Sequence, residues 1–185
     1  MKTNQLDILS PFMIVIWLIC IWLPITAQAD EVKWQVYKSQ EFNIEFLSLT
    51  APQERKFDSA DAVRVVWHIG FMEDGTNGSI EVTRLKDGGL RAFSVIQQAS
   101  ELRKGIEQSG KTKVFSQKNV LMNGVPAIEF GTTMTTQKGH IWYGITRIQV
   151  VGDTLYNIMI TCPQKEKTTE PDIIKYLNSL KIILK

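Results

Sequence analysis

Between residues 113 and 162 the sequence repeats one pattern, in which short alternating apolar segments are separated by turns of two or three residues. The turns are Asn123-Gly124, Gln137-Lys138-Gly139 and Gly152-Asp153, which contain residues that favour tight turns. Strands that follow one another through such short turns have to be antiparallel, because a parallel pair needs a long crossover. The segment therefore predicts an antiparallel meander. Its expected strands are residues 114–115, 120–122, 127–134, 141–151 and 155–162.

A second group of strands is predicted upstream of this meander. Residues 34–46 alternate between apolar and polar side chains, which favours two short strands around a turn at residues 39–41. Residues 63–72 and 79–85 are predicted to form a hairpin, and residues 51–62, which are polar, to form a loop. The expected core-facing residues of the first hairpin strand are Val63, Val65, Trp67, Ile69 and Phe71.

Two segments have the period of an amphipathic helix instead. Apolar residues recur every three or four positions in residues 92–108, and Gly110 stands where a C-capping glycine is expected. A final helix is predicted to begin at Thr169, its N-cap. The apolar residues expected on that helix are Ile173, Ile174, Leu177 and Leu180. The order of strands, helix, strands and helix indicates an α+β domain, with helices packed on a twisted antiparallel sheet.

The amino-terminal segment has the features of a secretory signal. Residues 12–23 form an uncharged apolar run, and Ala27-Gln28-Ala29 then places small residues at the two positions that a signal peptidase recognises. We therefore expect a signal peptide over residues 1–29, cleavage between Ala29 and Asp30, and a single domain over residues 30–185. The protein would be exported to the periplasm or the extracellular space. The alternative is that the segment stays uncleaved and associates the domain with a membrane.

Charge and cysteine content exclude two further classes. The chain carries 21 Lys and Arg against 19 Asp and Glu, whereas a nucleic-acid-binding domain would show a concentrated basic face. Cleavage after Ala29 would leave Cys162 as the single cysteine, so an internal disulfide is excluded. Cys162, at a strand end, is predicted to be a small buried hydrophobe.

Four fragments of the sequence together resemble a known group of proteins. They are WQVYKS with FNIEF within residues 34–46, NGVPAIE at residues 123–129, GDTLY at residues 152–156 and YLNSLKI at residues 176–182. In this order and spacing the chain resembles the PsbP-like and DcrB-like families over most of residues 32–184. Leu47 departs from their pattern, since these families usually place a proline after the second strand.

The resemblance implies an α/β/α sandwich and an exported or membrane-adjacent accessory protein that is not an enzyme. Proteins of this fold act mostly by binding other proteins or by supporting assembly of membrane complexes. They share no catalytic residue set, so no catalytic position is carried over to this chain. No cofactor is indicated, by the resemblance or by the residues.

One segment matches a nucleotide-binding motif by its letters. Residues 105–112 fit G-x-x-x-x-G-K-[ST], with Gly105, Gly110, Lys111 and Thr112 at the defining positions. A phosphate-binding loop has to lie between a strand and a following helix, so that backbone N–H groups and the helix amino terminus face the phosphates. Here a predicted helix precedes the motif and a predicted strand follows it. We therefore expect no nucleotide at this segment.

The acidic residues and histidines do not suggest an active site. His68 and His140 lie on separate predicted strands, and a metal site needs three or four ligands. No G-x-S-x-G nucleophile motif is present. Glu45, Glu81 and Glu129 alternate with apolar residues along their predicted strands, so their side chains are expected to face solvent. The sequence therefore predicts neither a metal nor a catalytic centre.

The remaining candidate site is a surface patch. Trp142 and His140 fall on the polar side of one predicted strand, and His68 and Arg64 on the polar side of another. An uncovered face would join them into an aromatic, mildly basic patch of the kind that anchors interfaces. The alternative is that a helix covers Trp142. We therefore expect a non-catalytic exported protein that binds an unidentified protein partner, such as a membrane protein. The competing hypothesis is a small-ligand carrier or minor hydrolase with a cleft in the sandwich.

Overall fold

The computed structural model describes residues 33–70, 75–86, 95–108 and 110–183, which all belong to the compact unit Lys33–Lys185. The predicted signal peptide, Phe71, Phe93 and part of the turn that follows residue 72 lie outside these described residues.

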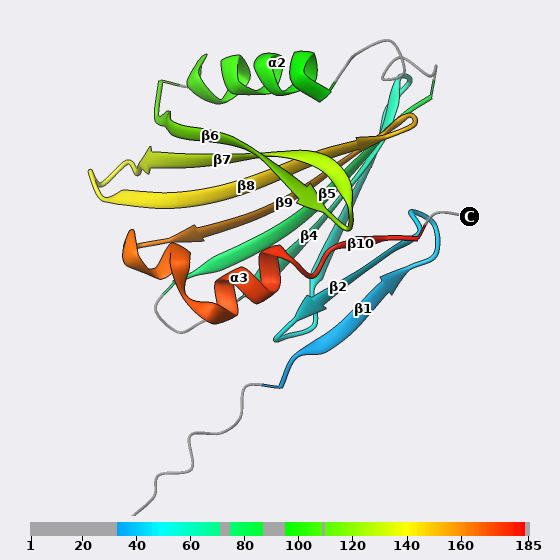
Figure 1. Cartoon of the computed structure of the whole chain (residues 1–185), viewed down its shortest axis with the longest axis horizontal. Helices are drawn as coiled ribbons and strands as arrows, with labels where there is room; N and C mark the ends of the chain where they lie inside the picture. Colours follow the sequence, from blue (N-terminus) through cyan, green and yellow to red (C-terminus); the bar gives the residue numbers. More distant parts are fainter. Residues whose placement is uncertain (1–32, 71–74, 87–94, 109, 184–185) are drawn as a thin grey trace, which may run out of the picture. The chain divides into compact units, whose positions relative to one another are not determined.

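Seven strands form the main sheet, and each is joined to its neighbours by antiparallel pairing (Figure 1). They are β3 (Gln53–Asp58), β4 (Ala62–Gly70), β5 (Asn77–Leu85), β6 (Thr112–Met122), β7 (Val125–Thr135), β8 (Ile141–Val151) and β9 (Thr154–Cys162). Their order in the sheet is β3-β4-β5-β9-β8-β7-β6. Two meanders, β3 to β5 and β6 to β9, therefore meet where β5 pairs with β9.

The turns of the second meander lie where the sequence predicts them. Asn123 and Gly124 have positive φ angles of 53° and 80°, the conformation that a two-residue hairpin of type I′ needs and that Asn-Gly adopts readily. Gly139 and Gly152 also have positive φ. The predicted antiparallel meander is confirmed.

A small sheet and short helices complete the fold. The small antiparallel sheet has the order β1-β2-β10, with β1 at Gln35–Ser39, β2 at Ile44–Ser48 and β10 at Lys181–Ile182. The helices are α2 (Val95–Gln108), the 3₁₀ helix η2 (Glu166–Thr169) and α3 (Pro171–Leu177). The main sheet separates α2 from α3, because alternate residues of β9 face one or the other. Ile160 packs in the same cluster as Ile173 of α3, whereas Met159 and Ile106 of α2 line one cleft. The α+β class is confirmed.

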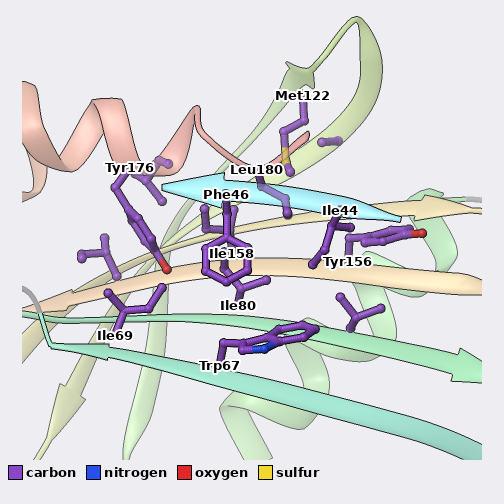
Figure 2. Close-up of a cluster of buried hydrophobic side chains, with 14 of the residues drawn as sticks. Ile44, Phe46, Trp67, Ile69, Ile80, Met122, Tyr156, Ile158, Tyr176 and Leu180 are labelled. Carbon is purple, nitrogen blue, oxygen red and sulfur yellow. The ribbon is translucent and has the colours of Figure 1, made fainter. Parts of the chain in front are cut away.

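The main hydrophobic core lies between the main sheet and the layer made by the small sheet and α3 (Figure 2). We call this side of the main sheet the core face and the other side the α2 face. Figure 2 shows Phe46 of β2 among Trp67 of β4, Ile80 of β5 and Ile158 of β9, and all four are buried. The predicted inward residues of β4 that the structure describes are confirmed in this orientation, and Cys162 is buried at the end of β9 as expected.

Two strands differ from the sequence prediction. Residues 51–62 contain β3 rather than only a loop, and all six residues of β3 are exposed. An edge strand of charged residues has no apolar alternation, so periodicity could not reveal it. Residues 114–115 and 120–122 belong to one strand, β6, which has a register irregularity between Val114 and Ser116.

The carboxyl-terminal segment also corrects the prediction. The N-cap of α3 is Glu170, not Thr169, whose hydroxyl instead donates to the Glu166 carbonyl at 2.9 Å. Pro171 explains the shift, because proline is favoured in the first helical turn. Leu180 is buried but follows the helix, and β10 after it was not predicted.

Candidate functional site

The α2 face is only partly covered by its helix. Helix α2 packs against β6, β7 and β8. A small apolar cluster of Ile128, Phe130 and Ile148 lies on this part of the sheet, with Val114 and Leu155 packed against it. Towards β3 the same face carries exposed side chains, among them Arg64 and His68 of β4. Two different surfaces therefore adjoin on one side of the main sheet.

A cleft of about 470 Å³ lies between the end of α2 and strands β7, β8 and β9, and we call it the α2 cleft. Its size falls in the range of about 300–1,000 Å³ that is usual for small-molecule sites. The residues that line it are Gly105, Ile106, Thr112, Thr132, Met134, Trp142, Tyr143, Gly144, Thr146, Met159 and Thr161.

Gly144 lies at the centre of the sheet surface that forms the floor of the cleft. It is paired with Thr132 of β7 on one side and with Thr161 of β9 on the other. A Cβ atom built on Gly144 would lie 2.6 Å from the Thr132 hydroxyl oxygen. A glycine in the interior of a strand often marks a site of close approach. Here the missing side chain leaves the floor open and lets the Thr132 hydroxyl and the Thr161 methyl group come near.

Trp142, Ile106 and Met159 supply the main apolar surface. Trp142 is half-buried and its ring lies against Gly75, where a Cβ atom would be 3.2 Å away. Gly75 has a φ of 91°, a conformation that glycine adopts without steric cost. Adding a side chain at Gly75 would therefore disturb both the turn and the indole that it supports.

The lining residues of the α2 cleft that the structure describes are uncharged. Within the part of the chain that the structure describes, the lining contains no carboxylate, histidine, lysine, arginine or cysteine. Tyr143 lies among the lining residues, but alternation along β8 directs its side chain to the core face, as it does for Ile145. The cleft thus has the chemistry to hold an apolar group and to donate or accept hydrogen bonds through threonine hydroxyls.

The described carboxylates and histidines do not form a metal centre. Among residues 33–70, 75–86, 95–108 and 110–183 there is no group of three His, Cys, Asp or Glu side chains able to hold a metal ion.

The most buried of the described ion pairs, Arg147 with Glu129, lies on the core face and not in the α2 cleft. The Arg147 Nε donates to the Glu129 carboxylate at 2.7 Å, and Lys118 approaches the same carboxylate at 2.8 Å. Arg147 also donates to the Leu177 carbonyl at 3.1 Å and to the Asn178 side chain at 2.6 Å. This charged cluster therefore fastens the end of α3 to β7 and β8, and its described contacts give it a structural role.

The prediction that Glu129 faces solvent is wrong. The residue is buried because the apolar row of β7, which includes Ile128 and Phe130, faces α2, while the end of α3 covers the other side. Burial acts to raise the pKa of Glu129, but hydrogen bonds from Lys118 and Arg147 outweigh it. The pKa of the carboxyl therefore lies below its usual value.

The four residues of the predicted patch lie in two separate places. Arg64 forms an ion pair with Glu81 at 2.6 Å, and His68 is exposed four residues further along β4. Trp142 lines the α2 cleft on β8, and His140 is exposed in the turn before it. Strands β5 and β9 lie between β4 and β8, a spacing of roughly 14 Å at about 4.8 Å per strand. The structure brings Trp142 together with α2 residues rather than with Arg64 and His68.

The segment with the phosphate-loop letters has the predicted order of elements. Gly105 lies in α2, Gly110 follows the helix with a φ of 66°, and Thr112 begins β6. The Lys111 carbonyl accepts a hydrogen bond from the Thr135 amide at 2.9 Å. A helix thus precedes the turn and a strand follows it, the reverse of a phosphate-binding loop. Gly105 and Thr112 line the α2 cleft, a position that the motif does not suggest.

Sequence reasoning did not find the floor of the cleft. Gly144, Thr132, Thr146 and Met159 were assigned only to strands. The sequence did contain one signal of the cleft. Gly144 is a glycine inside a predicted strand, and such a glycine often marks a place where another group comes close. What could not be read from the sequence is that α2 lies over this part of the sheet.

Comparisons with known proteins support the fold. No protein-family model matches the chain, and no curated protein matches its sequence. Among solved structures, the cyanobacterial PsbP protein (CyanoP) from Synechocystis matches with a TM-score of 0.58 and 12% identity, over 86% of this chain and 98% of that one. A protein of unknown function from Pseudomonas aeruginosa matches with a TM-score of 0.49 and 11% identity, over 78% and 94% of the two chains. The first of these shows that the chain has a PsbP-like fold, as the resemblance predicted.

A helix that crosses a membrane has to be long and apolar. Of the helices in the described residues, none combines the length and the apolar character needed to cross a membrane.

Proposed function

We propose that this chain is a non-catalytic binding protein that holds an apolar group of its ligand in the α2 cleft. The observation that carries the proposal is a cleft of about 470 Å³ whose described lining residues are all uncharged. Ligand sites are typically concave and mostly apolar with a few polar groups. The side chains most often used in acid–base and nucleophilic catalysis include carboxylates, histidine, lysine and cysteine, and the described lining contains none of these four kinds.

Cleft-filling variants test this proposal. Gly105 lines the cleft from α2, and a Cβ atom there would have no other atom within 4 Å. Gly105→Leu should therefore fold and occupy the cleft from above. We expect it to abolish binding of small apolar molecules, as measured by calorimetry, whereas Gly105→Ala should retain most of it. Equal binding by the wild type and Gly105→Leu would show that the cleft is not the site.

A protein partner is the second candidate ligand. In this form of the proposal the chain is an exported accessory protein that binds its partner at or near a membrane. The exposed side chains of β3 and β4 on the α2 face favour it, since Phe57 is 52% exposed and its ring lies 5.8 Å from the Arg64 guanidinium. Aromatic residues and arginine are enriched at the energetic centres of interfaces. The binding surface would then include Arg64 and His68 as well as Trp142.

Capture from a membrane extract tests the second candidate. The protein, expressed with a carboxy-terminal tag, is used to isolate partners from detergent-solubilised envelopes, and these are identified by mass spectrometry. Arg64→Ala and Trp142→Ala should each reduce recovery of a specific partner. Arg103→Ala, which removes an arginine from α2 that pairs with Glu107, should not. Equal recovery with all three variants would contradict a partner surface on the α2 face.

A further inference from the structure

Two threonine residues on the floor of the α2 cleft are largely buried, but their hydroxyls stay accessible from the cleft. Thr132 is 9% exposed and Thr146 is 4% exposed, and both line the cleft. Among the described residues, neither side chain takes part in a hydrogen bond. A ligand that covered these hydroxyls without bonding to them would leave them unsatisfied, at a cost of about 1–3 kcal/mol each. Two accessible hydroxyls in an otherwise apolar cleft therefore favour a ligand with a polar group that can bond to them.

The positions of these hydroxyls define where that polar group would sit. Thr132 is paired with Gly144, and Thr146 is the next residue of β8 on the same face. Thr161 flanks Gly144 from β9, but its hydroxyl already donates to the Asn77 carbonyl at 3.4 Å. The open hydrogen-bonding positions thus lie on the β7 and β8 side of the glycine.

The chemistry of the lining limits the ligand further. An ionised head group in an apolar cleft needs an opposite charge or several strong hydrogen bonds to offset its desolvation. The described lining contains no charged side chain. A hydroxyl can both donate and accept, so it suits an alcohol, an ester or an amide. The head of the ligand is therefore expected to be neutral and polar.

We infer that the α2 cleft binds a small neutral amphiphile, whose uncharged head meets the Thr132 and Thr146 hydroxyls while its apolar body lies against Trp142, Ile106 and Met159. This inference rests on the proposed function and narrows it, because it names the class of ligand. The volume of about 470 Å³ fits a small molecule, since ligand sites fall in this range.

A series of probes with one body and different heads tests the inference. Binding of 1-octanol, octanoate and octylammonium to the purified protein is measured by calorimetry at pH 7.5. We expect 1-octanol to bind at least about ten-fold more tightly than either ion, because the described lining residues offer no charge to pair with them. Thr132→Val and Thr146→Val keep the shape of the side chain and remove the hydroxyl. Each should weaken 1-octanol about five-fold and leave the ions almost unchanged.

The outcomes separate the two proposals. Ions that bind as tightly as 1-octanol, or valine variants that bind 1-octanol like the wild type, would overturn the amphiphile inference. If Gly105→Leu still abolished binding in that case, the cleft would remain an apolar site as proposed above. If no probe bound, the small-ligand form of both proposals would be wrong. Trp142→Ala is a second test of the cleft, since it removes apolar surface without adding bulk to the floor, and it should weaken 1-octanol.

Discussion

The two faces of the main sheet are built from the same strands but differ in what covers them. The core face packs against the small sheet and α3, and Ile80, Ile158 and Ile160 on it have no exposed surface. The α2 face has a small apolar cluster, a cleft and exposed side chains. The packed core and the proposed binding surface are thus separated by the alternation of each strand, which sends neighbouring residues to opposite faces. The comparison of the two faces shows that an apolar residue in a strand is not always in the core, because its burial also depends on what covers its face of the sheet.

The largest expected difference concerns apolar truncation on the two faces. Phe46 is buried on the core side and stacks near Tyr37 and Trp67, with ring centroids 5.9 and 5.8 Å away. Phe46→Ala should lower the free energy of unfolding by about 3–5 kcal/mol, because it removes a large side chain from a packed core. Met159→Ala on the α2 face should cost less than about 1.5 kcal/mol, since that side chain already borders a cleft. Urea unfolding of both variants measures this, and equal losses would remove the distinction between the faces.

The next largest effect is expected at the buried charge of the core face. Glu129→Gln should lower the free energy of unfolding by about 2 kcal/mol at neutral pH, because it weakens hydrogen bonds from Arg147 and Lys118. The folded-state pKa of Glu129 is depressed. The carboxylate therefore contributes stability above the unfolded pKa of about 4.3, and this contribution is lost as the pH falls through the folded pKa.

Unfolding curves of the wild type and Glu129→Gln, measured from pH 3 to pH 7, test whether the stability contributed by the carboxylate falls towards acid pH. The difference between the two proteins should be greatest above about pH 5 and should shrink towards acid. A difference that stayed constant with pH would mean that the variant acts through packing and not through the charge.

A smaller effect with the opposite sign is expected on the α2 face. Gly105 is a helical glycine with open space around it. Gly105→Ala should raise the free energy of unfolding by up to about 1 kcal/mol, because alanine has the higher helix propensity. Thermal unfolding measures the change. A loss of stability would show that α2 packs more closely at this position than the structure indicates.

The smallest effect is expected at the exposed part of the α2 face. His68 is exposed on β4, and His68→Ala should change the free energy of unfolding by no more than about 0.5 kcal/mol. Its stability is measured by the same urea titration. A larger loss would place His68 in the packed part of the sheet and would leave only the cleft as a candidate for binding.

The sequence predicted those parts of the fold that depend on local pattern. Strands with clear alternation, such as β4 and β9, and the turn at Asn123-Gly124 were predicted near their actual positions, because neighbouring residues determine them. Edge strand β3 and strand β10 were not predicted, since their pairing partners lie elsewhere in the chain. Glu129 was assigned to the wrong environment for the same reason. A strand that is covered on both sides no longer shows which face is buried.

The candidate site depended still more on distant contacts. Trp142 was predicted to lie on the polar side of its strand, but its neighbours in space come from α2 and from Gly75. The grouping with Arg64 and His68 assumed that residues on one face lie close together. Two intervening strands separate them. Faces can be predicted from alternation, whereas distances across a sheet need the strand order.

The pairing of β10 with β2 has a consequence for the time at which the fold can form. Strand β2 lies near the beginning of the described chain and β10 near its end, and Ile182 pairs with Ile44 across that separation. Tyr176 and Leu180 enter the same core as Phe46. During synthesis the first strands are therefore made long before the residues that cover them. We expect the growing chain to keep this apolar surface uncovered until residues 176–182 have emerged, so that this core closes only after they are made.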